Sequence, residues 1–301
     1  MTADSPSRPD PGVRCVADVH AVLGEGPVWV ERDAALYWVD IKGRKIFRLD
    51  AEGDRREWAT PLRVGSLAPR ASGGFIAGTD EGIAAIDLDS DGDRARLTII
   101  VQPEAHLPDN RFNDGKVDRR GRFWAGTMDD LEKDSTGTLY RLGPDLAACP
   151  IDVGYKVTNG PAFSPSGDIM YHNDSARQVT YAFDLDGEGR ASERRIFATY
   201  GESDGYPDGM TVDAEGCLWI AFWDGWCVRR FSPAGECVAT LGVPVSRPTS
   251  CAFGGPRLDQ LYITSASVGL DATQLGGEPQ AGGLFVAAPG VSGLRELPFA
   301  G

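Results

Sequence analysis

Short runs of alternating apolar and polar residues, separated by turn residues, recur along the whole chain. In GRFWAGT at 121–127, for example, Phe123 and Ala125 alternate with Trp124 and Gly126, which is typical of a β-strand with two different faces. Apolar residues at helical spacing are hardly visible in any segment. The pattern therefore favours an all-β protein and excludes a βαβ solenoid or a barrel with helices outside.

The strand pattern repeats as six copies of one unit. The copies start at equivalent positions 39 to 49 residues apart, namely Gly26, Gly65, Asp114, Gly160, Asp208 and Pro248. Propeller blades repeat every 40 to 50 residues or so, about the same interval. In each copy an apolar strand, a Gly or Asp turn, an aromatic-rich strand, a second turn and a third strand follow in order, and a fourth strand fits in the connection. The repeats predict an all-β fold, a six-bladed β-propeller.

The same repeats predict the domain organisation. Residues 13–301 are expected to form one propeller domain after a flexible N-terminus at residues 1–12. Two domains of three copies each are the alternative, but no linker or composition break supports it. Four tryptophans that mostly recur at the second strand of their copies are expected in the core between blades: Trp38, Trp124, Trp219 and Trp223.

Charge and cysteine content narrow the partners and the location. Among the 301 residues, 44 acids against 30 bases give a net charge of -14, spread along the chain, so neither nucleic acid nor an anionic membrane is an expected partner. No apolar run approaches the roughly 18 residues of a membrane-spanning helix. Six cysteines without a C-x-x-C pair predict a cytoplasmic protein without disulfides, with Cys217, Cys227 and Cys237 as small buried residues. The oligomeric state stays open, and a monomer is compatible with the sequence.

Polar residues gather at the start of the six copies. The first strand of a propeller blade is the innermost, so these positions approach one another around one mouth of the channel. The residues found there are Glu25, Ser66, Asn113, Asp114, Asn159, Asp208 and Thr249. Carboxylates brought together in a partly enclosed mouth repel one another and are poorly solvated, so the ring predicts a bound cation. The other interpretation is that the Glu-Gly, Asn-Gly and Asp-Gly pairs only form turns.

Oxygen ligands of this kind favour one hard divalent ion such as Ca²⁺, Mg²⁺ or Mn²⁺, although Zn²⁺ and Fe²⁺ also accept carboxylates. Two carboxylates and an amide leave coordination positions for water and substrate, as in an open catalytic site. The ring therefore predicts a metal-dependent enzyme more readily than a structural metal site.

An ordered set of motifs over nearly the whole chain resembles the family of senescence marker protein 30 (regucalcin), gluconolactonase and related sugar lactonases. The motifs are LGEGP at 23–27, NRFNDGKVD at 110–118, GRFWAGTM at 121–128, TNGPAFSPSG at 158–167 and YPDGMTVDAEG at 206–216. Each motif alone is a weak signal, whereas the ordered set is specific.

The resemblance implies the role of several residues. It implies that Glu25, Asn159 and Asp208 hold the divalent cation, and that Arg111 and Asn113 bind hydroxyl and carbonyl oxygens of the substrate, with Asp114 completing the turn or reaching water near the metal. Mammalian-type members carry an acidic residue in the loop after G-T-M where this chain has Leu131. Asp130 is therefore the candidate substrate contact in that loop; the alternative interpretation is a merely solvated loop.

The function implied by the resemblance is that of a carboxylic ester hydrolase acting on a small sugar lactone, of the gluconolactonase, xylonolactonase or arabinolactonase type. In this hypothesis the metal polarises the lactone carbonyl and Asp208 is the general base. Metal coordination lowers the basicity of Asp208, so the attacking water must be made more acidic as well. Nucleophilic catalysis is not expected, because there is no G-x-S-x-G motif, and His172 is expected to be a structural residue.

Two other functions fit the same scaffold. A calcium-dependent phosphotriesterase would use the cation on a phosphoryl oxygen instead of a carbonyl. A non-catalytic calcium-binding regulator or interaction platform is the second, because a fold does not determine a function. A platform has no need of acids aligned at one mouth, which favours the enzyme.

Overall fold

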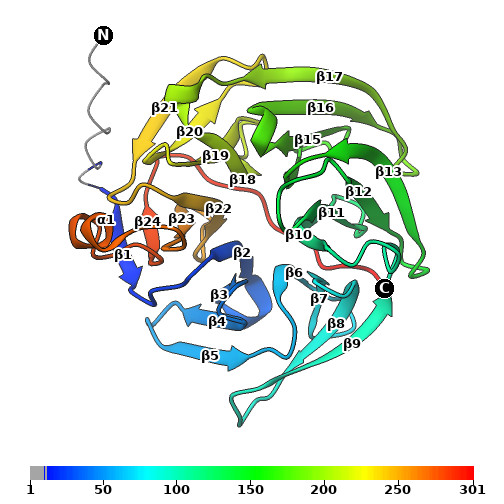
Figure 1. The fold of residues 1–301 in the computed structure, drawn as a ribbon, viewed down its shortest axis with the longest axis horizontal. Coiled ribbons are helices and arrows are strands. Elements are labelled where there is room, and N and C mark those ends of the chain that lie inside the picture. The colour runs from blue at the N-terminus through cyan, green and yellow to red at the C-terminus, as the bar shows by residue number, and fades with distance from the viewer. Residues whose placement is uncertain (1–9, 11) are drawn as a thin grey trace.

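The computed structural model describes residues 10 and 12–301. It consists of six four-stranded sheets arranged around a central axis, with almost no helix (Figure 1). The predicted six-bladed β-propeller is therefore confirmed. Of the segment predicted to be flexible, residues 1–12, all but Asp10 and Gly12 lie outside the described residues.

The blades are numbered by the order of their innermost strands. Blade 1 contains β2 (Gly24–Val30), β3 (Ala35–Asp40), β4 (Lys45–Asp50) and β5 (Arg55–Ala59). Blade 2 contains β6 (Val64–Pro69), β7 (Phe75–Thr79), β8 (Ile83–Leu88) and β9 (Ala95–Val101). Blade 3 contains β10 (Asn110–Val117), β11 (Phe123–Asp129), β12 (Gly137–Leu142) and β13 (Ala148–Tyr155).

The other three blades follow the same order. Blade 4 contains β14 (Thr158–Phe163), β15 (Ile169–Asp174), β16 (Val179–Leu185) and β17 (Ala191–Thr199). Blade 5 contains β18 (Tyr206–Val212), β19 (Leu218–Trp223), β20 (Cys227–Phe231) and β21 (Cys237–Gly242). Blade 6 contains β22 (Pro248–Gly254), β23 (Gln260–Ser265), β24 (Leu284–Ala287) and the N-terminal strand β1 (Arg14–Ala17), which pairs with β24 and so closes the ring.

In residues 10 and 12–301, helical structure is confined to connections. The short helix α1 (Ala272–Gly277) lies between β23 and β24, and three single 3₁₀ turns are η1 (Glu31–Asp33), η2 (Ser175–Arg177) and η3 (Glu202–Asp204). No helix in the described part of the chain is long and apolar enough to cross a membrane.

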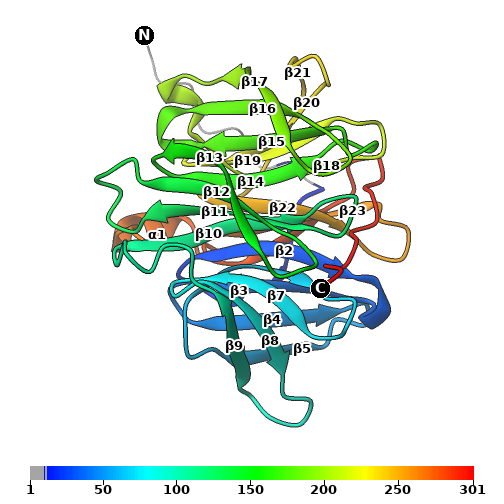
Figure 2. The same cartoon turned by 90° about the vertical axis from the view of Figure 1, so that its right-hand side faces the viewer.

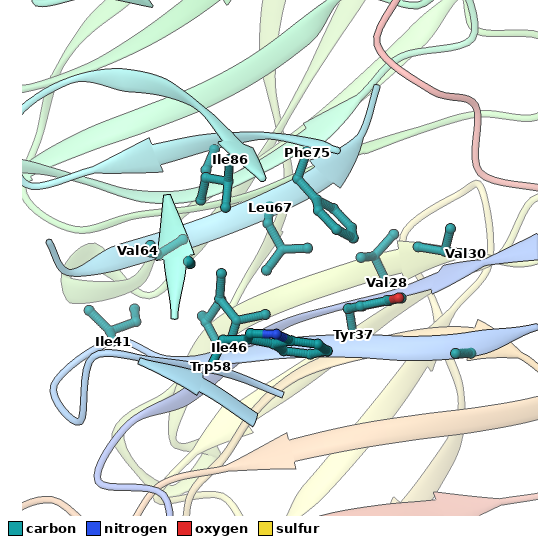
Figure 3. Packing of buried hydrophobic residues seen from close by; sticks show 14 of the residues in the cluster. Val28, Val30, Tyr37, Ile41, Ile46, Trp58, Val64, Leu67, Phe75 and Ile86 are labelled. Carbon is teal, nitrogen blue, oxygen red and sulfur yellow. The ribbon is translucent and has the colours of Figure 1, made fainter. Parts of the chain in front are cut away.

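The hydrophobic core is divided into six clusters, each between two neighbouring blades. Figure 3 shows the cluster between blades 1 and 2, where Val28 and Tyr37 face Leu67 and Phe75. The rings of Tyr37 and Phe75 lie 4.9 Å apart between their centroids. Alternate residues of each strand thus serve the two faces of a blade, as the strand pattern predicted.

The tryptophans and cysteines follow the predicted core positions with two exceptions. Trp38, Trp124 and Trp219 are buried, whereas Trp223 at the end of β19 is only half-buried. The prediction that Cys237 is buried is wrong: its strand β21 is the outermost of blade 5, and the side chain is exposed. All six cysteines are free thiols.

The C-terminal segment, residues 288–301, crosses the face of the propeller on which the first hairpin turn of each blade lies (Figures 1 and 2). Ala214 of blade 5 donates a backbone hydrogen bond to Ser292, and Phe299 donates one to Pro69 of blade 2. Ala300 donates another to Gly121 of blade 3. The segment therefore lies on the face opposite the starts of the innermost strands.

Candidate functional site

The starts of the six innermost strands share a local distortion. Each pairs with its neighbour through a register irregularity, which falls at Glu25/Val28, Val64/Ser66, Phe112/Gly115, Asn159/Ala162, Pro207/Met210 and Pro248/Ser250. A β-bulge twists a strand and changes the direction of a side chain. The bulges explain how a polar residue on an otherwise apolar inner strand can face the channel.

Three carboxylates from alternate blades meet at this mouth. Glu25 on β2, Asp114 on β10 and Asp208 on β18 are all buried. Burial raises the pKa of Glu25 well above its usual value, and the charges of Asp208 and Asp114 raise it further. Burial and the charge of Asp114 likewise raise the pKa of Asp208. The three groups are therefore close enough to repel one another, as predicted for the ring.

Asp114 differs from the other two carboxylates because the backbone holds both of its oxygens. Oδ1 accepts a hydrogen bond from the amide of Gly115 at 2.7 Å, and Oδ2 accepts one from the amide of Gly160 in blade 4 at 2.9 Å. Burial raises the pKa of Asp114 to about 6, while Lys116 and these amides act to lower it. Asp114 thus completes its own turn and joins blade 3 to blade 4.

Asn159 presents its amide oxygen in a fixed orientation. Its Nδ2 donates to Oγ of Ser175 at 2.8 Å, and Ser175 in turn donates to the carbonyl of Pro207 at 2.6 Å. Its Oδ1 accepts from Nδ2 of Asn113 at 3.0 Å. An amide oxygen has two lone pairs, so one remains for another ligand. Of the predicted metal ligands, Asn159 is the neutral one.

Arg111 and Asn113 form a bonded pair beside the carboxylates. Nη1 of Arg111 donates to Oδ1 of Asn113 at 2.6 Å. Nδ2 of Asn113 donates to the carbonyl of Thr158 at 2.8 Å as well as to Asn159. Both amide hydrogens of Asn113 are therefore used within the protein, and a lone pair of its oxygen is left for a substrate donor.

The two hydroxyl positions of the ring differ. Ser66 is fully buried, and its Oγ has no hydrogen-bond partner among the described residues. Thr249 donates to the carbonyl of Gly24 in blade 1 at 2.5 Å instead, and the neighbouring Ser250 lines the small cavity that also contains Asp114. Ser250 and Ser66 are each the first paired residue after the bulge of their strand, so Ser250, and not Thr249, is the equivalent of Ser66.

Two further residues at the site carried no signal in the repeats. Lys116 lies on the covered side of Asp114, where its Nζ donates to the carbonyl of Met210 at 3.1 Å and lies 3.6 Å from Glu296 of the C-terminal segment. Arg63, just before β6, contacts the Asp130 carboxylate with Nη1 at 2.8 Å. Leu131, next to Asp130, is 59% exposed.

His172 lies away from the ring, in the packing between blades 3 and 4. Its ring makes an edge contact with Tyr155, with 4.7 Å between centroids, and neither of its nitrogens has a hydrogen-bond partner among the described residues. Burial lowers its pKa to about 3. The expectation of a structural histidine agrees with this environment.

The mouth carries the residues that the sequence predicted as metal ligands. Within residues 10 and 12–301 no group of three or more His, Cys, Asp or Glu side chains is arranged to hold a metal ion. The predicted set has two carboxylates, Glu25 and Asp208, and the amide oxygen of Asn159. Mutual repulsion of the carboxylates and the unpartnered Ser66 hydroxyl beside them are features that a hydrated hard cation would relieve.

Comparison with known proteins agrees with this architecture. The model of the SMP-30/Gluconolactonase/LRE-like region matches residues 23–267. The chain is similar to regucalcin of Gallus gallus, with 38% identity over 96% of this chain and 98% of the relative. It is also similar to 6-deoxy-6-sulfogluconolactonase of Pseudomonas putida, with 36% identity over 96% of this chain and 99% of the relative.

A solved structure gives the same result. The crystal structure of a calcium-binding protein, regucalcin, from Agrobacterium tumefaciens superposes with a TM-score of 0.89, at 28% identity, over 95% of this chain and 96% of the other. With the family match over most of the length, the chain belongs to the SMP-30/gluconolactonase/LRE-like family.

Proposed function

We propose that this protein hydrolyses a sugar lactone to the corresponding aldonic acid, with one divalent cation held by Glu25, Asn159 and Asp208. The observation that carries the proposal is the buried ring of carboxylates contributed by blades 1, 3 and 5 at the starts of their innermost strands, with Arg111 beside it. The relative named 6-deoxy-6-sulfogluconolactonase supports a lactone as the substrate class.

The donor set fits a hard divalent ion. Carboxylate and amide oxygens favour Ca²⁺, Mg²⁺ or Mn²⁺, with Zn²⁺ and Fe²⁺ as further candidates, and the relative described as a calcium-binding protein supports Ca²⁺. When bound, the cation would supply Lewis-acid polarisation of the lactone carbonyl and counter-charge for the ring.

Asp208 is the general base of the proposal. It would accept a proton from the water whose oxygen attacks the carbonyl carbon; the ring C–O bond then breaks and the ring oxygen is protonated, giving the hydroxy acid. Without a cation, burial and the neighbouring charge of Asp114 raise the pKa of Asp208. A bound cation would lower this pKa again, so the attacking water would have to be made more acidic as well. The carbonyl of Asp208 accepts from Nδ2 of Asn173 at 2.7 Å, which fixes the backbone that carries the base.

Arg111 and Asn113 would orient the substrate. Arg111 is buried and bonded to Asn113, so its guanidinium is held in one place before substrate arrives. A preorganised donor beside the reacting carbonyl lowers the entropic cost of orientation. The substrate class is therefore a small lactone with hydroxyl groups that accept hydrogen bonds. A cytoplasmic location, with the six free thiols kept reduced, belongs to the same proposal.

The proposal is tested with metal-stripped protein and a substrate panel. Proton release at near-neutral pH is followed with D-xylono-, L-arabinono- and D-gluconolactone and with an organophosphate triester, each with Ca²⁺, Mg²⁺, Mn²⁺, Zn²⁺ or Fe²⁺ added in turn. We expect one ion to restore hydrolysis of a lactone well above its spontaneous rate. A clear preference for the triester would instead support the phosphotriesterase, and no acceleration of any substrate would support the non-catalytic regulator.

A further inference from the structure

Arg63 reaches from blade 2 to the mouth residues of blade 3. Its Nη1 donates to Oδ2 of Asp130 at 2.8 Å. Its own orientation is fixed by Asp80 at the end of β7, which accepts from Nε of Arg63 at 2.9 Å and from its backbone amide at 3.1 Å. The side chain of Arg63 is 27% exposed, so the contact with Asp130 is made in a partly desolvated place, where an ion pair is stronger than at a free surface.

Asp130 joins two arginines. Its second oxygen, Oδ1, accepts from Nε of Arg111 at 2.6 Å. We call Arg63, Asp130 and Arg111 the arginine bridge. Burial acts to raise the pKa of Asp130, but the bonds from Arg63 and Arg111 hold it below its usual value. Because both oxygens of Asp130 are engaged by guanidinium groups, this residue is better suited to hold Arg111 than to bind substrate itself.

The bridge determines where the remaining donor of Arg111 lies. Nε is bonded to Asp130 and Nη1 to Asn113. Nη1 also donates to the carbonyl of Phe112 at 3.2 Å, which leaves Nη2 as the donor for a substrate. A guanidinium is planar, so two fixed nitrogens fix the third. Arg111 and Asp80 both line a cavity of ≈ 210 Å³ between blades 2 and 3.

We propose that Arg63 is a positioning residue that acts on substrate binding through Asp130 and Arg111. The proposal rests on the proposed function, in which Arg111 binds the lactone. Without Arg63, Asp130 loses one of its two partners and is free to rotate, and Arg111 loses the fixed acceptor of its Nε. The substrate would then bind less tightly, while Asp208 and the cation ligands are unchanged.

The kinetic test is a double-mutant cycle. Arg63→Met and Asp130→Ala should each raise KM about tenfold, the effect expected when one hydrogen bond between charged groups is lost, with kcat changed less than about threefold. The double variant should be no worse than Asp130→Ala alone, because Arg63 acts only through Asp130. Arg63→Lys, which keeps one charged donor, should recover part of the affinity.

The matched control is Arg195→Met. Arg195 forms an exposed ion pair with Asp184 at 2.7 Å on blade 4, so its loss should leave KM unchanged. If KM of the double variant rose by the product of the two single factors, Arg63 would contact the substrate directly. That result would overturn the proposal. So would an unchanged KM in Arg63→Met.

A second readout does not depend on activity. The Nε–Hε signal of Arg111, assigned by its loss in Arg111→Lys, should shift in ¹⁵N NMR spectra of Arg63→Met but stay in place in Arg195→Met. If the protein hydrolyses no lactone but this shift occurs, the proposed function is wrong, while the positioning of Arg111 by Arg63 through Asp130 is supported. If the signal of Arg111 is the same in Arg63→Met and in the unsubstituted protein, the bridge fails whatever the activity.

Discussion

His172 gives the protein a defined sensitivity to acid. Its imidazole is fully buried beside Tyr155 and has no hydrogen-bond partner among the residues that the structure describes. Burial lowers its pKa from 6.5 to about 3. Between these values the unfolded chain binds a proton that the folded protein does not. His172 therefore leaves the free energy of unfolding unchanged above pH 6.5 and lowers it progressively as the pH falls toward 3.

The magnitude follows from the shift. One pKa unit corresponds to about 1.4 kcal/mol, so at pH 4.5, two units below the unfolded value, His172 alone should lower the free energy of unfolding by roughly 3 kcal/mol. His172→Phe keeps a ring against Tyr155 and removes the titrating group. At pH 7.5 the variant should lie within about 1.5 kcal/mol of the unsubstituted protein, because it replaces two unpartnered nitrogens by carbon.

The assay is urea unfolding at pH 7.5 and at pH 4.5. From pH 7.5 to pH 4.5, the free energy of unfolding of His172→Phe should rise by about 3 kcal/mol relative to that of the unsubstituted protein. His172→Leu should show the same relative rise if the larger ring of Phe strains the core. His106→Phe, at an exposed histidine, is the control and should show no gain. If the two proteins differed in free energy of unfolding by the same amount at both pH values, His172 would not cause the sensitivity to acid. Lactone hydrolysis by His172→Phe should persist, since His172 lies outside the ring.

Three further predictions concern the ring and the hairpin turns. Asp114→Asn removes one of the repelling carboxylates, whose pKa is raised to about 6. The free energy of unfolding of the metal-free protein at pH 8 should therefore rise by about 2 kcal/mol, once the loss of one backbone hydrogen bond is subtracted. A melting temperature below that of the unsubstituted protein would contradict this. Addition of the preferred cation should raise the melting temperature of the unsubstituted protein but not of Glu25→Gln, as measured by calorimetry; equal shifts would exclude Glu25 as a ligand. Asp213 accepts from the indole of Trp219 at 2.9 Å and from Nε of Arg230 at 2.8 Å, so Asp213→Ala should cost about 3–5 kcal/mol in urea unfolding, whereas a loss below 1 kcal/mol or so would show that these groups find other partners.

The blades were predictable because different copies contain the same hairpin turn, made by residues that are close in sequence. In blades 3 and 5 the segments VDRRGRFW and VDAEGCLW place an aspartate, a glycine and a tryptophan at the same spacing. In both, the carboxylate accepts from the indole, at 2.8 Å for Asp118 and Trp124 and at 2.9 Å for Asp213 and Trp219. Such patterns involve only residues that are close in sequence, so they can be recognised without a structure.

The parts that escaped prediction depend on contacts between distant segments. Arg63 and Asp130 are 67 residues apart and lie in different blades, and no periodicity links them. Ser250, and not Thr249, is the equivalent of Ser66 because each follows the bulge of its strand, and no motif in the sequence marks where a bulge falls. The path of the C-terminal segment likewise depends on contacts with distant blades, such as the 3.6 Å approach of Lys116 Nζ to Glu296.

The central claim is that Asp208 removes a proton from water at a cation-dependent lactonase site. Its most direct test is the initial rate of lactone hydrolysis by Asp208→Asn in a pH-stat, with the preferred cation at saturation and the fold checked by circular dichroism. The account predicts that kcat falls at least about 100-fold, the usual contribution of a general base, while the spectrum is unchanged. A folded, cation-saturated Asp208→Asn protein that hydrolyses the lactone at the unsubstituted rate would contradict it.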